Sequence, residues 1–271
     1  MLSPEASQPS KLNCSESVGS VAATALAQRV VSIHQPHYLP WLGLLAKIAA
    51  SDIFIWLDTV QYNRWDFQHR TRYSTEHGLK YLSLSVCSKG TQTNRVLIKD
   101  VLLADKQILP KHFQTLRHRY GKTPGWKHVK ERLAYIYHHP FERMDEVCWA
   151  TTRLSLDLFH LKPVVHIASQ LPVVGVKSEL MLNLTRAVGG DHYLSGPGAR
   201  TYLDMAIFAQ AGTGVSFHEF KHPIWKQTSG HPFHAAAFAM EWFLEEPEEA
   251  VAGFQQLLRS NLNHPSRCFQ Y

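Results

Sequence analysis

The clearest hydrophobic pattern lies near the start of the chain. Residues 30–33 form a short apolar run rich in β-branched side chains, and apolar residues at helical spacing follow from Leu42 to Ile48. A second run of β-branched and aromatic residues covers residues 53–57. This order of strand, loop, helix and strand predicts one βαβ unit over residues 30–58, with two parallel strands.

Helical and strand patterns alternate along the rest of the chain. The predicted helices of the middle region cover about residues 105–119, 125–138 and 142–160, after a third predicted strand at residues 81–86. The later predicted strands are residues 163–168, 191–194 and 215–220, with helices at 178–189, 202–211 and about 234–259. We therefore expect an α/β fold in a single domain, with a mixed or largely parallel sheet, a βαβ start and a helical insertion.

Composition predicts one folded domain between two tails. The chain has 271 residues, of which 45% are hydrophobic, and this is enough for a well-buried core. Residues 1–28 are rich in Ser, Ala, Gln and Pro, so we expect a disordered leader there. The α/β domain is expected over residues 29–255, with a C-terminal tail at residues 256–271.

Cysteine spacing and hydropathy indicate the cellular compartment. The four cysteines lie far apart without a CxxC pair, so neither a zinc ribbon nor a disulfide framework is expected. No apolar run reaches the roughly 20 residues of a transmembrane helix, and no signal-peptide pattern opens the chain. These features predict a soluble cytoplasmic protein that does not contact a membrane.

A polar loop stiffened by prolines follows the first predicted strand. It contains His34, Gln35 and Tyr38, which can act as acid, base or hydrogen-bonding groups. Loops at the carboxyl ends of strands form the ligand crevice of open α/β sheets, and Asp58 and Gln61 should emerge beside this loop after the second strand. We predict that His34 and Asp58 are catalytic and that Gln35, Tyr38 and Gln61 bind substrate. The alternatives are an ordinary loop histidine and a carboxylate that caps a turn.

Two later segments add candidate binding residues. Arg70 and Arg72 point the same way if the chain is extended there, which suits bidentate binding of a phosphate or carboxylate. A polar strand edge is the alternative for this pair. Two glycines between Ser195 and Tyr202 can form an anion-binding nest at a helix start, or a plain strand-to-helix turn. We predict that these four residues gather with the polar loop around one concave pocket.

Most of the net charge of +6 lies in one stretch. Residues 106–132 contain eight basic residues and a single acidic one. Such a stretch suits a phosphate-rich ligand such as a nucleotide, a nucleotide sugar or tRNA, with Lys122, Lys127 and Lys130 as candidate phosphate contacts. The alternative is a solvated helical face without a partner.

Common catalytic motifs do not occur in the chain. There is no Walker loop, no Gly-x-Gly-x-x-Gly fingerprint and no Gly-x-Ser-x-Gly elbow. The 17 histidines are scattered and show no zinc-type spacing. His34 and His37 could share a metal with Asp58, but no further ligand supports that arrangement. We therefore expect neither a metal nor a cofactor.

The polar loop is part of a longer series of motifs. Residues 34–43 read HQPHYLPWLG, and residues 57–62 read LDTVQY. The later motifs in the series are Arg70, Tyr120-x-x-x-Pro124, Ser178-Glu179, the YLSGPGARTYL segment at 193–203, and His222-Pro223 with Gln227. In this order, over about residues 30–230, the series resembles the WbqC-like family. The chain departs from the family pattern at Trp225 and at residues 238–241, which read FAME.

The resemblance implies a role in biosynthesis. Members of the family occur in O-antigen and other biosynthetic gene clusters, and one suggested role is a glycine transferase that acylates an amino sugar. This implies an enzyme that moves an aminoacyl group from an activated donor, such as aminoacyl-tRNA, to a small-molecule amine in glycan or natural-product biosynthesis. The alternatives are a nucleotidylyltransferase-like enzyme that binds a nucleoside triphosphate at the HQPHYLPW loop, and a non-catalytic binding module.

Overall fold

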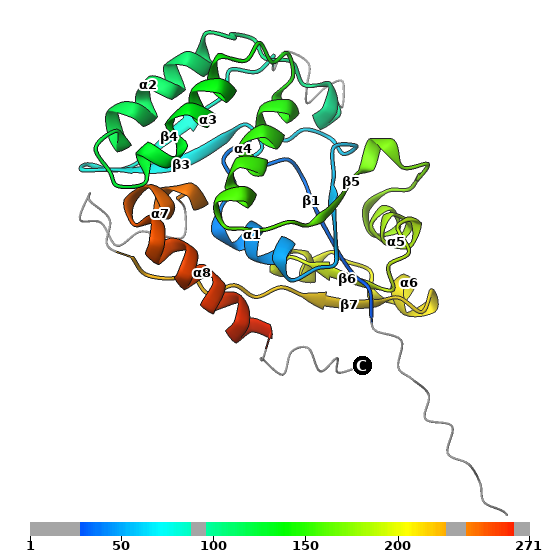
Figure 1. Ribbon diagram of the computed structural model, residues 1–271. Helices are drawn as coiled ribbons and strands as arrows, with labels where there is room; N and C mark the ends of the chain where they lie inside the picture. Colours follow the sequence, from blue (N-terminus) through cyan, green and yellow to red (C-terminus); the bar gives the residue numbers. More distant parts are fainter. Residues whose placement is uncertain (1–27, 88–95, 226–236, 263–271) are drawn as a thin grey trace, which may run out of the picture.

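The computed structural model describes residues 28–87, 96–225 and 237–262, whose elements are arranged around one parallel sheet (Figure 1). The strand order in this sheet is β5-β2-β1-β6-β7. The strands are β1 (Val30–His34), β2 (Ile53–Trp56), β5 (Val164–Ile167), β6 (His192–Ser195) and β7 (Gly214–Phe217). The predicted βαβ start is confirmed, because β1 and β2 are adjacent and parallel.

The strand order creates a switch point between β1 and β6. The chain leads outward from β1 through β2 to β5, and then returns past β1 to add β6 and β7. In open parallel sheets, ligands commonly bind at the carboxyl ends of the strands where the order reverses. The topology therefore favours a ligand-binding site at the carboxyl ends of β1 and β6.

Strands β1 and β6 separate before β1 ends. The pairing of β1 with β2 continues to His34, whereas its pairing with β6 stops at Ser32. The carbonyl of His34 accepts a hydrogen bond from Leu57 N–H on the β2 side. Successive carbonyls of a strand face opposite neighbours, so the carbonyl of Ile33 faces β6 without a partner in the ladder. A buried carbonyl in that position needs another donor.

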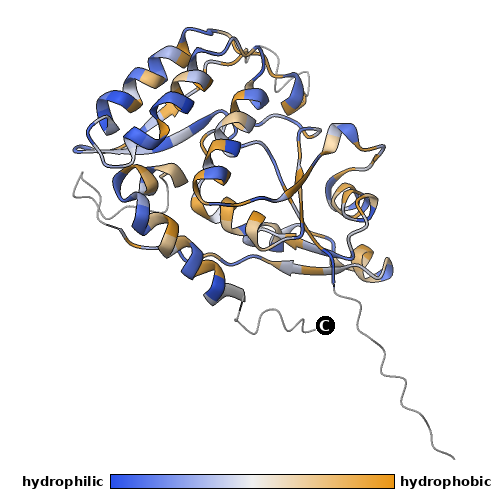
Figure 2. Ribbon diagram, viewed as in Figure 1, coloured by the Kyte–Doolittle hydropathy of each residue, from blue (hydrophilic) through white to orange (hydrophobic). Residues whose placement is uncertain are grey.

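Helices cover both faces of the sheet. They are α1 (Leu42–Ala49), α4 (Met144–Leu158), α5 (Lys177–Ala187) and α6 (Met205–Gln210). Phe54 and Trp56 of β2 pack in one hydrophobic cluster with α1 and α4, while Ile53 and Ile55 pack in a second cluster with α5 and α6. Figure 2 shows the apolar colouring along these central strands. Burial on both faces is typical of parallel sheets.

A hairpin and a helical insertion complete the fold. The hairpin consists of β3 (Arg70–Thr75) and β4 (Gly78–Ser83). The helical insertion consists of α2 (Ile108–Tyr120), α3 (Trp126–His138) and the short 3-10 helix Ile98–Asp100. β3 and β4 form their own antiparallel sheet. The predicted insertion is therefore confirmed, but the strand predicted at residues 81–86 begins earlier and belongs to this hairpin.

Several predicted boundaries shift. The helix predicted at residues 202–211 is preceded by the 3-10 helix Pro197–Thr201 and begins only at Met205, because the Asp204 side chain caps its first turn. The last helical region is two helices, α7 (Ala239–Glu245) and α8 (Pro247–Leu262), and α8 runs through residue 255, where the domain was expected to end. The expected leader lies outside the described residues, apart from residue 28. No helix of the described chain is long and apolar enough to cross a membrane.

A buried carboxylate joins the hairpin, the insertion and α7. Glu241 accepts hydrogen bonds from the Tyr120 hydroxyl at 2.6 Å and from Ser74 N–H at 3.0 Å. Arg119 donates to the Ser74 carbonyl at 2.7 Å and pairs with Glu245 at 3.3 Å. Burial raises the pKa of Glu241. Glu241 therefore supplies a structural contact between three elements.

Candidate functional site

His34 is the last residue of β1, and its ring has a defined tautomer. Its Nδ1 lies 2.8 Å from the carbonyl oxygen of Gln35. A carbonyl can only accept, so Nδ1 carries the proton and Nε2 carries the lone pair. Burial, followed by repulsion from Lys47 and His37, lowers the pKa of His34 well below its usual value. His34 is therefore a neutral imidazole near pH 7, with Nε2 available as a proton acceptor.

Lys47 occupies the gap between the ends of β1 and β6. Its side chain is 5% exposed, and its Nζ donates to the free carbonyl of Ile33 at 2.9 Å. Among the described residues, no carboxylate forms an ion pair with Lys47. Burial lowers its pKa to about 7. A buried lysine amine with a lowered pKa thus lies at the switch point beside His34.

Two more histidines surround this position. The His37 ring lies 6.3 Å from that of His34, and its buried Nδ1 has no hydrogen-bond partner within the described chain. His218 follows β7, and its backbone N–H donates to the Ser195 carbonyl at 2.8 Å. Burial lowers the pKa of both rings to about 4, and repulsion from Lys47 adds to the shift of His218. We call Lys47, His34, His37 and His218 the Lys47 cluster.

Arg70 and Arg72 lie near the Lys47 cluster, and Phe67 lies between them and His37. Both guanidinium groups lie 5 to 6 Å from the ring centres of Phe67 and Tyr81, so they share one face of β3. Phe67 also stacks on His37 at 5.7 Å. Arg72 donates to the Tyr81 hydroxyl, and neither arginine forms an ion pair within the described residues. Two guanidinium groups without a counter-charge are available to an anionic ligand.

Trp41 covers the start of α1. A Cβ atom on Gly43 would lie 2.0 Å from the Trp41 ring, so the indole rests directly on this glycine. The same ring stacks on His222 at 5.5 Å and meets Phe220 edge-on. The indole therefore occupies the space over the first turn, where a phosphate would otherwise approach the free N–H groups of the helix. This geometry argues against a phosphate at the α1 N-terminus.

Asp58, predicted as catalytic, has its side chain engaged elsewhere. Its carboxylate accepts from Ser169 N–H at 2.9 Å and from the Ser169 hydroxyl at 2.5 Å, so it joins the end of β2 to the 3-10 helix Ala168–Gln170. Gln61 is exposed and pairs through its backbone with Leu97. These contacts favour a structural role for Asp58 and place neither residue in contact with His34.

Tyr38 and Gln35 take different directions from the same loop. The Tyr38 side chain is fully buried, and its hydroxyl bonds to His112 Nδ1 and to the Tyr137 hydroxyl, both at 2.8 Å. Tyr38 thus anchors the loop to α2 and α3 rather than facing a ligand. Gln35 accepts a hydrogen bond from Gln68 at 2.6 Å, which connects the loop with the segment before β3.

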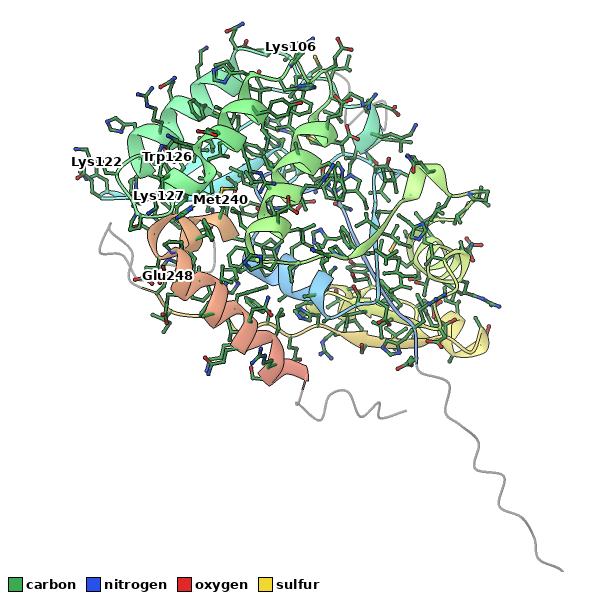
Figure 3. The ribbon with its side chains drawn as sticks, viewed as in Figure 1. Lys106, Lys122, Trp126, Lys127, Met240 and Glu248 are labelled. Atoms are coloured by element: carbon green, nitrogen blue, oxygen red, sulfur yellow. The ribbon has the colours of Figure 1, made fainter. Side chains whose placement is uncertain are left out.

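The remaining predicted residues are spread over the molecule. Ser195 is buried at the end of β6 and donates to the Tyr193 hydroxyl at 3.2 Å, whereas Tyr202 is 72% exposed. Lys122, Lys127 and Lys130 are exposed on the α2–α3 pair. Figure 3 shows Lys122 at the outer end of this pair and Lys127 close to Trp126. The structure therefore brings His34, Gln35, Arg70 and Arg72 to one region and keeps the lysines on a separate surface.

A cavity of about 390 Å³ lies beside the turn between α3 and α4. It is lined by His139, Pro140, Phe141, Glu142, Glu146, Trp149, Ala150 and Arg153. One of these lining residues, Trp149, meets Trp56 of β2 with ring centres 5.1 Å apart. None of the residues predicted for the site lines it.

Comparison with known proteins identifies the family. The WbqC-like protein family matches residues 35–250, which is more than half of the chain. The chain belongs to the WbqC-like protein family. A curated relative of this WbqC-like protein, the uncharacterized protein Rv1507c of Mycobacterium tuberculosis, is 27% identical over 202 residues, or 70% of this chain and 82% of the relative. No solved structure matches.

The sequence analysis of this WbqC-like protein did not single out Lys47 or His218, and it considered His37 as a possible metal ligand and as part of the polar loop. A usable signal existed for Lys47, since it is the one charged residue in the otherwise apolar eight-residue helix α1. A lysine in such a helix must find a partner inside the fold. His218 had no local signal, because its place near Lys47 follows from the strand order and not from neighbouring residues.

Proposed function

We propose that this WbqC-like protein is a biosynthetic transferase that moves an aminoacyl-type group from an activated donor to an amine acceptor. The tautomer of His34 carries the proposal. Its Nδ1–H is committed to the Gln35 carbonyl, so Nε2 is left as a base, and the lowered pKa keeps the ring neutral near pH 7. An amine that attacks an acyl carbon must give up a proton, and a positioned neutral histidine accepts it.

The reaction balances with donor and acceptor alone. The acceptor nitrogen attacks the acyl carbon of the donor ester, and a C–N bond forms while His34 Nε2 takes the proton from nitrogen. The C–O bond of the ester then breaks, and the same proton passes from His34 to the leaving oxygen. His34 thus serves first as base and then as acid, and it ends the cycle neutral.

Arg70 and Arg72 supply a place for an anionic part of one substrate. Their guanidinium groups share one face of β3, have no carboxylate partner among the described residues, and connect to His37 through Phe67. Bidentate contacts from arginine are well suited to phosphate and carboxylate groups. In this proposal they orient the donor or acceptor so that its reacting atom lies near His34.

Aminoacyl-tRNA is the donor class that we propose. The chain contains none of the common ATP-binding motifs, so the donor would arrive already activated. The exposed Lys122, Lys127 and Lys130 would then contact backbone phosphates of the tRNA. The acceptor would be a small amine of glycan or natural-product biosynthesis, as the family resemblance implies.

A second candidate, nucleotidyl transfer, has one observation in its favour. The strand order places a loop with two histidines, His34 and His37, at the switch point of a parallel sheet, where nucleotides commonly bind. The Trp41 indole over the first turn of α1 counts against it, because this position would receive a phosphate. We therefore rank it below acyl transfer.

Product analysis distinguishes these functions. Purified full-length protein is incubated with glycyl-tRNA and glucosamine, in parallel with other aminoacyl-tRNAs and amines, and amide products are identified by mass spectrometry. The proposal predicts an amide with the wild type and with His77→Ala, an exposed histidine in the turn between β3 and β4. With His34→Ala the amide should form roughly 10²–10⁴-fold more slowly. Release of pyrophosphate from a nucleoside triphosphate, without any amide, would support the second candidate instead. Absence of both products would leave a binding module.

A further inference from the structure

We infer that the Lys47 cluster binds an oxyanion group, phosphate or carboxylate, of the substrate at the separated ends of β1 and β6. The inference rests on the proposed function for the place of the reaction, and it adds a chemical requirement on the substrate. This anion site is distinct from Arg70 and Arg72, which lie beyond His37 and Phe67 on the hairpin.

The position of Lys47 is the first reason. Its Nζ reaches the carbonyl of Ile33, in the gap that opens where the pairing of β1 with β6 stops at Ser32. An ammonium group has three N–H donors, and this carbonyl is its one hydrogen-bond acceptor among the described residues. The other N–H donors can therefore serve a ligand.

The second reason is the missing counter-charge. His34 and His218 flank Lys47 from the ends of β1 and β7, and Lys47 lowers the pKa of both. The titratable groups that influence this cluster are its own members, and no carboxylate of the described residues raises the pKa of any of them. A buried, protonated Lys47 without an acid beside it is costly, and an anionic ligand would offset that cost.

The third reason is an unsatisfied buried atom. His37 is 9% exposed, and its Nδ1 has no hydrogen-bond partner in the described part of the chain. Buried polar atoms without a partner are uncommon in proteins and often mark a place that a ligand completes. His37 contacts His34 edge-on with ring centres 6.3 Å apart, so it lies beside the histidine whose pKa Lys47 lowers.

Anion binding has a measurable consequence for protonation. The free protein holds Lys47 with a pKa of about 7, so most of its amine is neutral at pH 8. An oxyanion beside Nζ favours the charged form and raises this pKa, so binding at pH 8 takes up a proton. The bound charge also offsets the repulsion between Lys47 and His34, and so makes Nε2 of His34 a stronger base when substrate is present.

Calorimetric titration tests the site without any enzymatic assay. Sulfate, which does not titrate near neutral pH, represents phosphate, and acetate represents carboxylate. Each is titrated into full-length protein at pH 8 in two buffers with different ionisation enthalpies, which reveals proton uptake. We expect uptake approaching one proton per bound anion. Comparison of the two affinities shows which oxyanion the site prefers. The affinity should be reduced about tenfold or more in Lys47→Met. Lys162→Met, an exposed lysine at the opposite edge of the sheet, should match the wild type.

The outcomes separate this inference from the proposed function. Binding without proton uptake, or equal affinity in Lys47→Met, or no binding of either anion by the wild type, would overturn the anion site. If Lys47→Met does not fold, two other measurements still test the anion site. These are the proton uptake of the wild type and the affinity of His218→Ala, which should be lower than that of the wild type. Acyl transfer that depends on His34 but not on Lys47 would leave the proposed function standing while this inference fails. Anion binding with no transfer would give the reverse result.

Discussion

Lys47 Nζ donates to the carbonyl of Ile33 at 2.9 Å, and this bond fills the place that β6 leaves vacant beside the end of β1. A buried amine thereby lies at the switch point of the sheet, next to the neutral imidazole of His34. Helix α1 has two tasks as a result, since its apolar residues pack on the sheet and its single lysine completes the candidate site.

The buried histidines should make stability depend on pH. The pKa of His37 is lowered to about 4 in the fold, against about 6.5 in an unfolded chain, so the unfolded state binds more protons between these values. Stability therefore falls as the pH drops from about 6.5 towards 4. His37→Phe, which retains a ring against Phe67, should reduce the slope by up to about 1.4 kcal/mol per pH unit. Urea denaturation at several pH values measures this, with exposed His118→Phe as the control, and identical slopes for all three proteins would refute it.

The contact between Gly43 and Trp41 predicts a sensitive position. A methyl group at residue 43 would meet the indole at 2.0 Å and displace it from its stack on His222. Gly43→Ala should lower the free energy of unfolding by about 1–3 kcal/mol, as overpacking does. Gly198→Ala is the control, since a Cβ there meets nothing within 4 Å. Urea denaturation measures the free energy of unfolding of both variants. Equal losses would show that the Trp41 indole does not restrict residue 43 to glycine.

The part of the fold that sequence predicted best depends on local pattern. Two β-branched runs with a short helix between them leave little choice but adjacent parallel strands, and the register of β1 with β2 agrees. The pairing of β4 could not be predicted in this way. An alternation of apolar and polar residues identifies a strand, but it does not show which other strand pairs with it. Gly78, with φ of 100°, closes the turn that pairs β4 with β3 instead of the main sheet.

The site divides along the same line. The i, i+2 spacing of Arg70 and Arg72 predicted one shared face, and both stack on the same two rings. Asp58 stands at a strand end as predicted, but its partner Ser169 is 111 residues away and could not be inferred locally. Lys47 and His218 meet only because the chain returns past β1 to build β6 and β7.

The basic surface of α2 and α3 predicts a salt-dependent interaction, if the donor is aminoacyl-tRNA. Replacing Lys122, Lys127 and Lys130 together with Ala should weaken tRNA binding and flatten its dependence on salt. Each lost phosphate contact should lower the slope of log affinity against log salt by about 0.7 to 0.9, while transfer from the bound state persists. Filter binding at several salt concentrations measures the slope, with Lys162→Ala as the control. A triple variant with wild-type affinity and slope would leave these lysines as a solvated surface.

The rate of single-turnover acyl transfer in His34→Ala tests the central claim most directly. His34 makes one hydrogen bond within its own loop, so its loss should change the free energy of unfolding by about 1 kcal/mol or less. The transfer rate should fall by roughly 10²–10⁴-fold, as expected for a lost general base. A folded His34→Ala protein with this deficit, beside a fully active His77→Ala, is the predicted result. A His34→Ala variant that transfers the acyl group at the wild-type rate would contradict the account.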